Sequence, residues 1–297
     1  MNNIAAVVVT YNRKQLLETC LEKLAGSTYP CDILLIDNGS TDGTSELIKE
    51  KFPGVSYFNT GENLGGAGGF RVGMELAVNK GYEYAWIMDD DTFVNPDTLE
   101  KLMDADKALE GKWAFLSSYA YWTDGSRCNM NFQRTGINSF AEDFESQTSP
   151  IIMATFVSFL IKCSVIKEMG LPIKEFFIWC DDLEYSRRVS MKYPGYFVPQ
   201  STVEHHMGSN AKVGIESESQ ERLWRYKYLY RNEYYVFSRE GFKGKLYVFL
   251  RVILHSLRVI KSSDNKKTKL GVIWNSYREG RRFHPAVEYV KEVKDAD

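Results

Sequence analysis

Short apolar runs alternate with helical patterns over the first third of the chain, and no other feature of the sequence constrains the fold as much. The apolar runs predict buried strands at residues 4–10, 33–37, 55–59 and 84–88. The intervening patterns predict helices at residues 13–25, 44–51 and 70–79, with a further helix that Pro96 opens. Such alternation is typical of an α/β domain with a mostly parallel central sheet, which is the fold class that we predict.

The rest of the chain shows two further patterns. Residues 113–162 are β-like and irregular, with a strong apolar run at 151–161, so we expect them to extend the sheet over a binding cleft. Beyond Glu216 the sequence becomes helical and rich in aromatic and basic residues. With 44% hydrophobic content, a chain of 297 residues can bury a core of ordinary size. We therefore expect one main domain at residues 1–210 and a helical region at residues 211–297.

Polar residues follow the predicted strands at the points where these strands end. Thr10 and Arg13 follow the first strand, Asp37 ends the second, Asn63 follows the third, and an acidic triplet at residues 89–91 ends the fourth. Ligands of parallel sheets collect at the carboxyl ends of the strands. A binding site at this edge of the sheet is therefore predicted.

The acidic triplet has the residue types of a cation site. Side chains two apart on an extended segment project to the same side, so Asp89 and Asp91 could share one ion. Hard carboxylate oxygens suit Mg²⁺ or Mn²⁺. The alternative is an acidic turn that caps the next helix, a role that Thr92 and Asp97 would also suit.

A second group of carboxylates lies in the segment FFIWCDDLEYSRR. Asp181, Asp182 and Glu184 open a predicted helix, where the helix dipole favours acidic side chains, so capping alone would explain one of them. The apolar FFIW run before them would place a carboxylate in a partly dry site. Burial of this kind raises a carboxyl pKa toward the value useful for a general base.

Two further patterns carry weaker signals. His205 and His206 follow a short predicted strand, and a neutral imidazole can complete a site for an ion such as Mn²⁺, although paired histidines in loops are more often exposed or packing residues. The glycine-rich loop at residues 63–69 would let backbone amides approach a phosphate or sugar closely. It lacks the G-x-G-x-x-G spacing of a dinucleotide fingerprint.

These motifs, in this order, resemble those of the family 2 inverting glycosyltransferases of the GT-A fold. The matching segments are VVVTYNR, LLIDNGSTDGT, NLGGAGGF, MDDD, WCDDLEYSRR and HHM, between residues 4 and 206. Within that family the sequence is most similar to bacterial galactofuranosyltransferases, whereas rhamnosyltransferases share the layout with less similarity in detail. The resemblance implies a GT-A catalytic domain at residues 1–210 with a C-terminal helical extension.

The resemblance also implies a role for each matching residue. Residues that contact the nucleotide or sugar are Thr10, Arg13, Asp37, Asn63, Gly65, Gly66 and Asp90. The ligands of a Mn²⁺ or Mg²⁺ ion that bridges the diphosphate are Asp89, Asp91 and His206. Asp182 is the catalytic base, and Trp179 and Asp181 line the acceptor site. Cys180 stands between the tryptophan and the aspartate pair and departs from the family pattern.

The implied reaction is a single displacement that inverts the anomeric carbon. Asp182 takes the proton of an acceptor hydroxyl while UDP departs from the opposite face. The expected donor is UDP-galactofuranose, and the expected acceptor is a cell-surface glycan or a polyprenyl-linked sugar. Two alternatives to this function are a rhamnosyltransferase that uses dTDP-rhamnose and a non-catalytic protein that binds nucleotide sugars.

A phosphatase with an acidic nucleophile is a different class of enzyme that the sequence disfavours. Its D-x-D motif would follow the first strand, with Thr or Val two places beyond it. Here Phe93 stands at that place, and the triplet follows the fourth strand.

The C-terminal region bears on partners and location. Its aromatic and basic helices could seat the protein on a membrane or form a subunit interface in a homo-oligomer. The apolar stretch at residues 246–260 is interrupted by Arg251, His255 and Arg258, so we expect no membrane span. Five scattered cysteines favour a reducing cytoplasm, with membrane contact at the inner face of the plasma membrane. A net charge of -2 gives no overall attraction to nucleic acid, and we predict no such partner.

Overall fold

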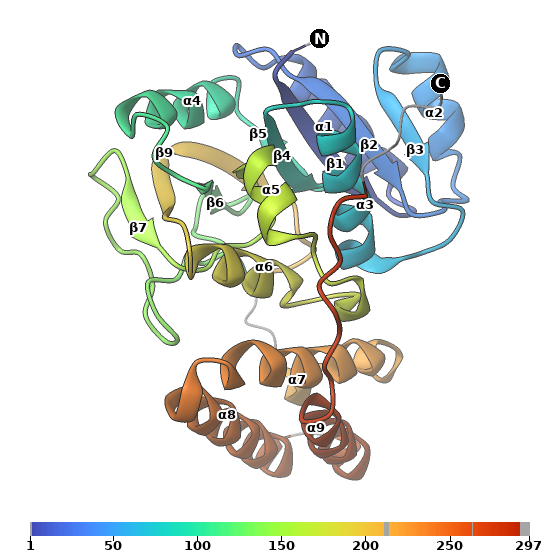
Figure 1. Cartoon of the computed structure of the whole chain (residues 1–297). Coiled ribbons are helices and arrows are strands. Elements are labelled where there is room, and N and C mark those ends of the chain that lie inside the picture. The colour runs from blue at the N-terminus through green and yellow to red at the C-terminus, as the bar shows by residue number, and fades with distance from the viewer. Residues whose placement is uncertain (1, 211–213, 263, 292–297) are drawn as a thin grey trace.

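A computed structural model describes residues 2–210, 214–262 and 264–291. It contains one sheet with helices on both faces and three long C-terminal helices beside it (Figure 1). The strands are β1 (Ile4–Thr10), β2 (Asp32–Asp37), β3 (Ser56–Asn59), β4 (Tyr84–Asp89), β5 (Thr92–Val94), β6 (Phe115–Tyr121), β7 (Ser149–Ile151), β8 (Phe159–Lys162) and β9 (Gly195–His205). The helices are α1 (Lys14–Ala25), α2 (Thr44–Lys51), α3 (Gly65–Asn79), α4 (Thr98–Ala108), α5 (Cys163–Met169), α6 (Asp181–Ser190), α7 (Leu223–Ser238), α8 (Gly241–Ser262) and α9 (Lys266–Gly280).

The sheet order is β3-β2-β1-β4-β8-β6-β9-β5, and β7 pairs with β9. Strands β3, β2, β1 and β4 are all parallel, as the alternating sequence pattern predicts. Beyond β4 the sheet is mixed, because β8 runs antiparallel between β4 and β6. The predicted α/β class with a parallel central block is confirmed, while the short strand β5 after the acidic triplet was not expected.

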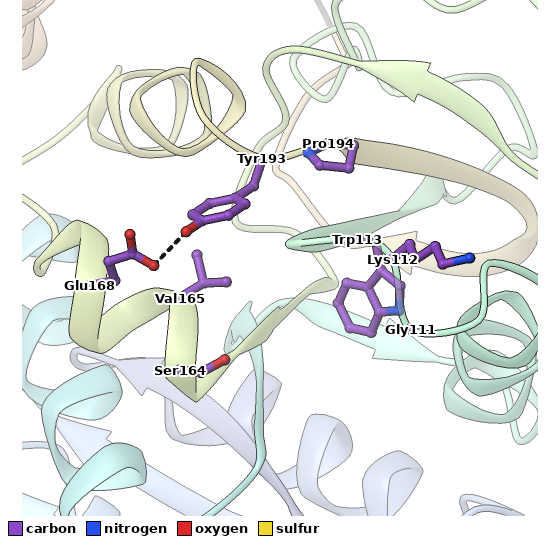
Figure 2. Close-up of a pocket in the computed structure, with 8 residues that line it drawn as sticks. All are labelled: Gly111, Lys112, Trp113, Ser164, Val165, Glu168, Tyr193 and Pro194. Carbon is purple, nitrogen blue, oxygen red and sulfur yellow. Dashed lines mark hydrogen bonds between the residues drawn. The ribbon is translucent and has the colours of Figure 1, made fainter.

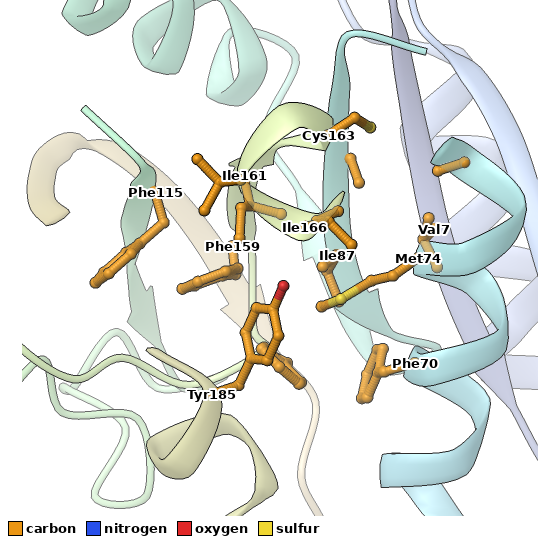
Figure 3. Packing of buried hydrophobic residues seen from close by; sticks show 14 of the residues in the cluster. Val7, Phe70, Met74, Ile87, Phe115, Phe159, Ile161, Cys163, Ile166 and Tyr185 are labelled. Carbon is orange, nitrogen blue, oxygen red and sulfur yellow. The ribbon is translucent and has the colours of Figure 1, made fainter. Parts of the chain in front are cut away.

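Apolar side chains cover both faces of the sheet. On one face Val7 and Ile87 pack under α3, α5 and α6, against Phe70 and Tyr185 among others (Figure 3). On the other face Val8 packs with residues of α1 and α4. Because successive residues of a strand point to opposite faces, β1 is buried along its whole length. Polar groups on these strands can therefore meet ligands only at the strand ends.

The glycine-rich segment is helical rather than a loop, since α3 begins at Gly65 instead of the expected Phe70. Two glycines let this helix lie close to the sheet. A Cβ atom at Gly69 would lie 2.5 Å from Val9 Cγ1, and one at Gly73 would lie 2.3 Å from Val7 Cγ1. The amino end of α3 is thereby held at the carboxyl edge of the sheet.

The C-terminal helices α7, α8 and α9 pack around a third apolar cluster, which also includes Ile173, Phe176 and Cys180 of the segment before α6. After α9 the chain returns along α3 (Figure 1). Glu288 accepts hydrogen bonds from Arg71 and from Lys174, and its carbonyl accepts one from the Leu171 N–H. The chain thus crosses back from the helical region to the sheet. None of the described helices is long and apolar enough to cross a bilayer.

The segment that leads into α6 has an unusual backbone. Phe177, Trp179 and Cys180 have φ values of 60°, 68° and 66°, a backbone conformation that residues other than glycine rarely adopt. The fully buried Asn232 of α7 donates hydrogen bonds from Nδ2 to the carbonyls of Phe176, Ile178 and Trp179 at 2.8–3.1 Å. One side chain from α7 therefore holds the turn on which α6 begins.

We predict that Asn232→Leu loosens this turn, because one buried and two partly buried carbonyls lose their donor while side-chain volume is kept. Leaving buried acceptors unpaired should lower the free energy of unfolding by about 1–3 kcal/mol. Urea denaturation gives this value, and hydrogen exchange of residues 176–182 locates the change. Asn79→Leu, at the exposed end of α3, is the matched control. Unchanged stability and exchange in Asn232→Leu would contradict the assignment.

Candidate active site

Four neighbouring strands bring their carboxyl ends to one edge of the sheet. Asp89 pairs in register with Val9, Thr10 with Asp37, and Asp37 with Asn59. The polar residues that follow separate strands in the sequence are therefore neighbours in space. This is the edge where sequence analysis predicts a binding site.

The acidic triplet lies at the centre of this edge, and β1 and the start of α1 supply its donors. The buried Asp90 carboxylate accepts hydrogen bonds from Thr10 Oγ1 at 2.7 Å and from Arg13 Nη1 at 3.2 Å. Asp91, also buried, accepts one from Arg13 Nη1 at 2.6 Å. Among the described residues, none donates a hydrogen bond to the Asp89 carboxylate, so its oxygens are available to a ligand.

The pKa values of the triplet follow from this uneven pairing. Burial raises the pKa of Asp90 to about 6, although the positive charge of Arg13 lowers it. Burial also acts to raise the pKa of Asp91, but His205 and Arg13 outweigh it and hold that pKa at about 2. Burial and the charge of Asp91 raise the pKa of Asp89 well above its usual value. Asp89 is thus the carboxylate that would gain most from a nearby cation.

A histidine completes a set of three candidate metal ligands. Ligand atoms of Asp89, Asp91 and His205 all lie within 4.8 Å of one another. Two carboxylates and an imidazole suit Mn²⁺, and Mg²⁺ also accepts carboxylate ligands. The donor types and their spacing therefore fit a divalent cation.

The histidine at this position is His205, whereas the sequence analysis assigned the ligand role to His206. His205 ends β9 opposite Thr92 and directs Nε2 to within 3.0 Å of Asp91 Oδ1. The next residue turns away because successive side chains of an extended segment point to opposite sides. His206 instead packs on Phe93, with ring centroids 3.9 Å apart, and its Nε2 lies 2.9 Å from Glu204 Oε1.

The partner of His205 fixes its tautomer. Asn131 donates from Nδ2 to Thr155 Oγ1 at 3.1 Å, which leaves Asn131 Oδ1 to accept from His205 Nδ1 at 2.8 Å. With one proton on Nδ1, His205 either donates a second proton from Nε2 to Asp91 Oδ1, 3.0 Å away, or turns a lone pair on Nε2 toward a cation that it shares with Asp91. The same pair of atoms can therefore pair by a hydrogen bond or bind a metal ion.

The residues predicted to contact the nucleotide line the same edge. Asp37 is fully buried and accepts hydrogen bonds from Tyr57 Oη at 2.6 Å and from the Ser40 N–H at 2.8 Å. Asn63 Oδ1 accepts the Gly65 N–H at 2.9 Å, directly before α3. Tyr57 escaped the sequence analysis, since an aromatic residue in a predicted strand gives no functional signal.

Gly65 and Gly66 form the first turn of α3, and the structure places Gly65 under the turn before α6. Gly65 has φ +71°, and a Cβ atom there would lie 2.2 Å from the Phe177 carbonyl oxygen. The Ala67 N–H donates to the same oxygen at 3.3 Å. The glycine-rich segment and the turn that carries the aspartate pair are thus in direct contact.

The aspartate pair opens α6, as the sequence predicts. Asp181 is buried and Asp182 is half-buried, with the Leu183 N–H donating to Asp182 Oδ1 at 2.7 Å. Burial raises the pKa of Asp182 to about 6, although the Leu183 N–H lowers it. Burial and the charge of Asp182 raise the pKa of Asp181 well above its usual value. Of two coupled carboxyls, Asp181 therefore holds a proton more tightly, and Asp182 is the one available as a base near neutral pH.

A chain of hydrogen bonds joins the metal-ligand cluster to the helix of the aspartate pair. It runs from His205 through Asn131 to Thr155. The neighbouring Ala154 bonds through both backbone groups to Ser186 Oγ, at 3.0 and 3.1 Å. The Asp182 carbonyl oxygen lies 2.7 Å from Ser186 Oγ and shares the single hydroxyl proton with the Ala154 carbonyl. The acidic triplet and the aspartate pair, which lie far apart in the sequence, thus share one polar framework.

Trp179, predicted to line the acceptor site, faces the C-terminal helix α7. Its ring packs edge-on against Tyr226, and the Arg225 guanidinium lies 4.9 Å from its centroid. Burial lowers the pKa of Arg225, and the charges of Arg222 and Arg13 lower it further. No described acidic residue forms an ion pair with Arg225. A cation of α7 thus lies against the turn that carries the aspartate pair.

Sequence analysis did not foresee the roles of Asn131, Asn232 and Arg225. Single asparagines in irregular or helical segments carry no distinctive pattern. Arg225 stands in the run RLWRYKYLYR, where every polar residue looks equally exposed. Only contacts between distant segments single these residues out.

A pocket elsewhere on the molecule is separate from this site. It has a volume of about 360 Å³ and is lined by residues that precede β6 and β9 and by α5, including Trp113, Glu168 and Tyr193 (Figure 2). Because β6 and β9 are parallel and end near the histidine, their starts lie at the opposite edge of the sheet. None of the residues discussed above lines this pocket.

Comparison with known proteins agrees with the fold and the motifs. Galactofuranosyltransferase GlfT1 of Mycolicibacterium smegmatis is 23% identical over 262 residues, covering 82% of this chain and 85% of the relative. An N-acetylglucosaminyl-diphospho-decaprenol L-rhamnosyltransferase of Mycobacterium tuberculosis is 26% identical over 233 residues, covering 68% of this chain and 76% of the relative.

A solved structure of similar fold is the mannosyltransferase PcManGT of Pyrobaculum calidifontis in complex with GDP-Man and Mn²⁺. It has a TM-score of 0.53 and 14% identity, covering 94% of this chain and 75% of that protein. This likeness confirms the predicted GT-A fold. Residues 5–170, more than half of the chain, match the family described as Glycosyl transferase family 2. The protein is thus a glycosyltransferase and belongs to family 2.

Proposed function

We propose that this enzyme transfers galactofuranose from UDP-galactofuranose to a hydroxyl of a cell-surface glycan or of a polyprenyl-linked sugar, with inversion at the anomeric carbon. Similarity to galactofuranosyltransferases along 82% of the chain supports the donor. The name of the rhamnosyltransferase relative, which includes a decaprenol-linked sugar, supports the acceptor class. In this proposal residues 1–210 are the catalytic domain, and residues 211–297 are a helical region that also contributes Asn232 and Arg225 to the site.

The observation that carries the proposal is the shared framework of the two acidic clusters. A charge-stabilising group and a base act on opposite sides of the bond that is exchanged, so they must be held at a constant separation. The hydrogen bonds through Asn131, Thr155 and Ser186 supply such a link. A protein that only bound nucleotide sugars would have no need of a carboxylate with a raised pKa at Asp182.

The proposed reaction is a single displacement. The acceptor oxygen forms a bond to the anomeric carbon while the bond from that carbon to the diphosphate oxygen breaks. Asp182 receives the hydroxyl proton, and the bond electrons leave with UDP. Thr10, Arg13, Asp37, Asn63, Gly65, Gly66 and Asp90 bind the nucleotide and sugar in this proposal, while Trp179 and Asp181 line the acceptor side.

A divalent cation, Mn²⁺ or Mg²⁺, held by Asp89, Asp91 and His205 would stabilise the charge that develops on the departing diphosphate. His205 replaces His206 in this assignment because its Nε2 lies beside Asp91. Arg13 already supplies positive charge to Asp90 and Asp91 and is free to meet phosphate with the rest of its guanidinium.

A second candidate is transfer of rhamnose from dTDP-rhamnose, which the 26% identity to a rhamnosyltransferase favours. We expect UDP-galactofuranose to support Mn²⁺-dependent release of the nucleoside diphosphate, and UDP-galactopyranose and dTDP-rhamnose to support little. The released diphosphate is measured with each donor, with and without Mn²⁺. Turnover of dTDP-rhamnose alone would replace the first proposal with the second.

The adjacent histidines provide a matched test of the metal site. His205→Ala should weaken Mn²⁺ binding by at least about 10-fold, because it removes a ligand. His206→Ala should change the affinity far less, since His206 packs on Phe93. Titration calorimetry with Mn²⁺ measures both. Equal losses in the two variants, or a loss only in His206→Ala, would refute the assignment.

The base can be identified by its pH dependence. With a pKa of about 6, Asp182 should be protonated as the pH falls below 6, so kcat/KM should decline there with unit slope. Asp182→Asn should lower kcat by about 100 to 10,000-fold and keep UDP binding. Asp97→Asn, at the exposed start of α4, is the control. Near-normal turnover of Asp182→Asn would exclude Asp182 as the base.

A further inference from the structure

Helix α8 exposes a continuous apolar stripe. Six large side chains at helical spacing, two of them adjacent, are between 42% and 58% exposed: Leu246, Phe249, Leu250, Leu254, Leu257 and Ile260. Phe242, one turn earlier, is 80% exposed. At 1.5 Å per residue, the stripe from Phe242 to Ile260 is about 27 Å long. Apolar surface gathered in this way on one face of a helix marks an interaction site.

The opposite face of α8 is fixed to the rest of the protein. Val248, Val252 and Val259 are buried in the C-terminal cluster. Tyr230 of α7 forms a hydrogen bond between its hydroxyl and His255 Nδ1 at 2.8 Å, and Arg251 pairs with Glu233 at 2.9 Å. The direction in which the stripe points is therefore set by α7.

The charges beside the stripe are all positive. Residues 241–262 include three lysines and two arginines and no Asp or Glu. Arg251 and Arg258 face Glu233 and Glu216, whereas no described residue forms an ion pair with Lys243, Lys245 or Lys261. These lysines flank the first and last turns of the helix. A partner must therefore offer hydrocarbon to the stripe and negative charge to its borders.

We propose that α8 lies on an anionic lipid bilayer, with its apolar stripe in the acyl boundary and its lysines at the headgroup phosphates. Helices with an apolar face and a cationic border bind in this way. A second copy of the chain fits less well, because a symmetric contact would bring like charges together with no acidic residue on α8 to pair them.

The bilayer contact gives the site an orientation. Helix α7 contacts both α8 and α6, and α6 begins with Asp181 and Asp182 (Figure 1). A membrane under α8 is thus separated from the helix of the aspartate pair by one helical layer. This consequence rests on the proposed function, whereas the lipid contact itself does not.

Co-sedimentation of the full chain with vesicles tests the contact. We expect binding to phosphatidylglycerol-containing vesicles and little binding to pure phosphatidylcholine. One lysine near an anionic surface contributes about 5-fold in partitioning, so the triple variant Lys243→Glu, Lys245→Glu, Lys261→Glu should lose at least about 100-fold. The charge-matched control reverses three exposed lysines on other faces: Lys23, Lys49 and Lys80.

The apolar stripe is tested with the double variant Leu250→Ser, Leu257→Ser, which should bind vesicles at least about 10-fold more weakly. Met191→Ser, 72% exposed at the end of α6, is the control. The Asp182→Asn enzyme should bind vesicles normally, which separates this inference from the proposed reaction. Equal binding to phosphatidylcholine, or binding retained after charge reversal, would overturn it. So would the absence of vesicle binding together with a dimer that the leucine variant dissociates.

Discussion

Three consecutive carboxylates at the end of a buried strand create the electrostatic problem that organises this protein. A carboxylate out of water is unstable unless positive charge or hydrogen-bond donors compensate it. Arg13 and Thr10 compensate Asp90, and Arg13 and His205 compensate Asp91. Asp89 has no such donor among the described residues. A further cation would compensate Asp89, and in the proposed function the cluster would hold that cation against the diphosphate of the donor.

The position of the aspartate pair depends on a strained backbone turn, which side chains and backbone of other segments hold in place. Three residues with positive φ before α6 store conformational energy that local sequence would not tolerate. Asn232 and the close approach of Gly65 to the Phe177 carbonyl hold this turn in place. Because α7 supplies Asn232, the helical region takes part in shaping the site as well as covering apolar surface.

The same helices connect the site to the molecular surface. On its inner side α7 presents Asn232 and Arg225 to the turn before α6, and on its outer side it fixes α8. Helix α7 thus lies between the helix of Asp182, the proposed base, and the exposed stripe of α8. In a membrane-bound enzyme such an arrangement would let the acceptor lipid and the water-soluble donor approach from different sides.

Local sequence was sufficient for the strands of the parallel block and for naming most of the candidate residues. Strand and helix periods repeat over short windows, so the parallel block and the start of α6 were predictable. Asp89, Asp91 and the aspartate pair were predictable too, because acidic residues directly after apolar runs are conspicuous. The glycine-rich segment was misread as a loop because glycine lowers helix propensity. Its glycines are needed because α3 packs closely on Val7 and Val9 of β1, a contact that the local sequence does not show.

Tertiary structure alone decided which partners these residues meet. The choice between His205 and His206 depends on which face of β9 meets the triplet, and adjacent residues of one strand differ only in direction. Asn131, Asn232 and Arg225 gain their roles from contacts over tens of residues, which no local period encodes. The sequence by itself determined the fold class, the strand ends and the chemical types of the site. Their convergence had to come from packing, because distance in space between remote segments is a property of the folded chain.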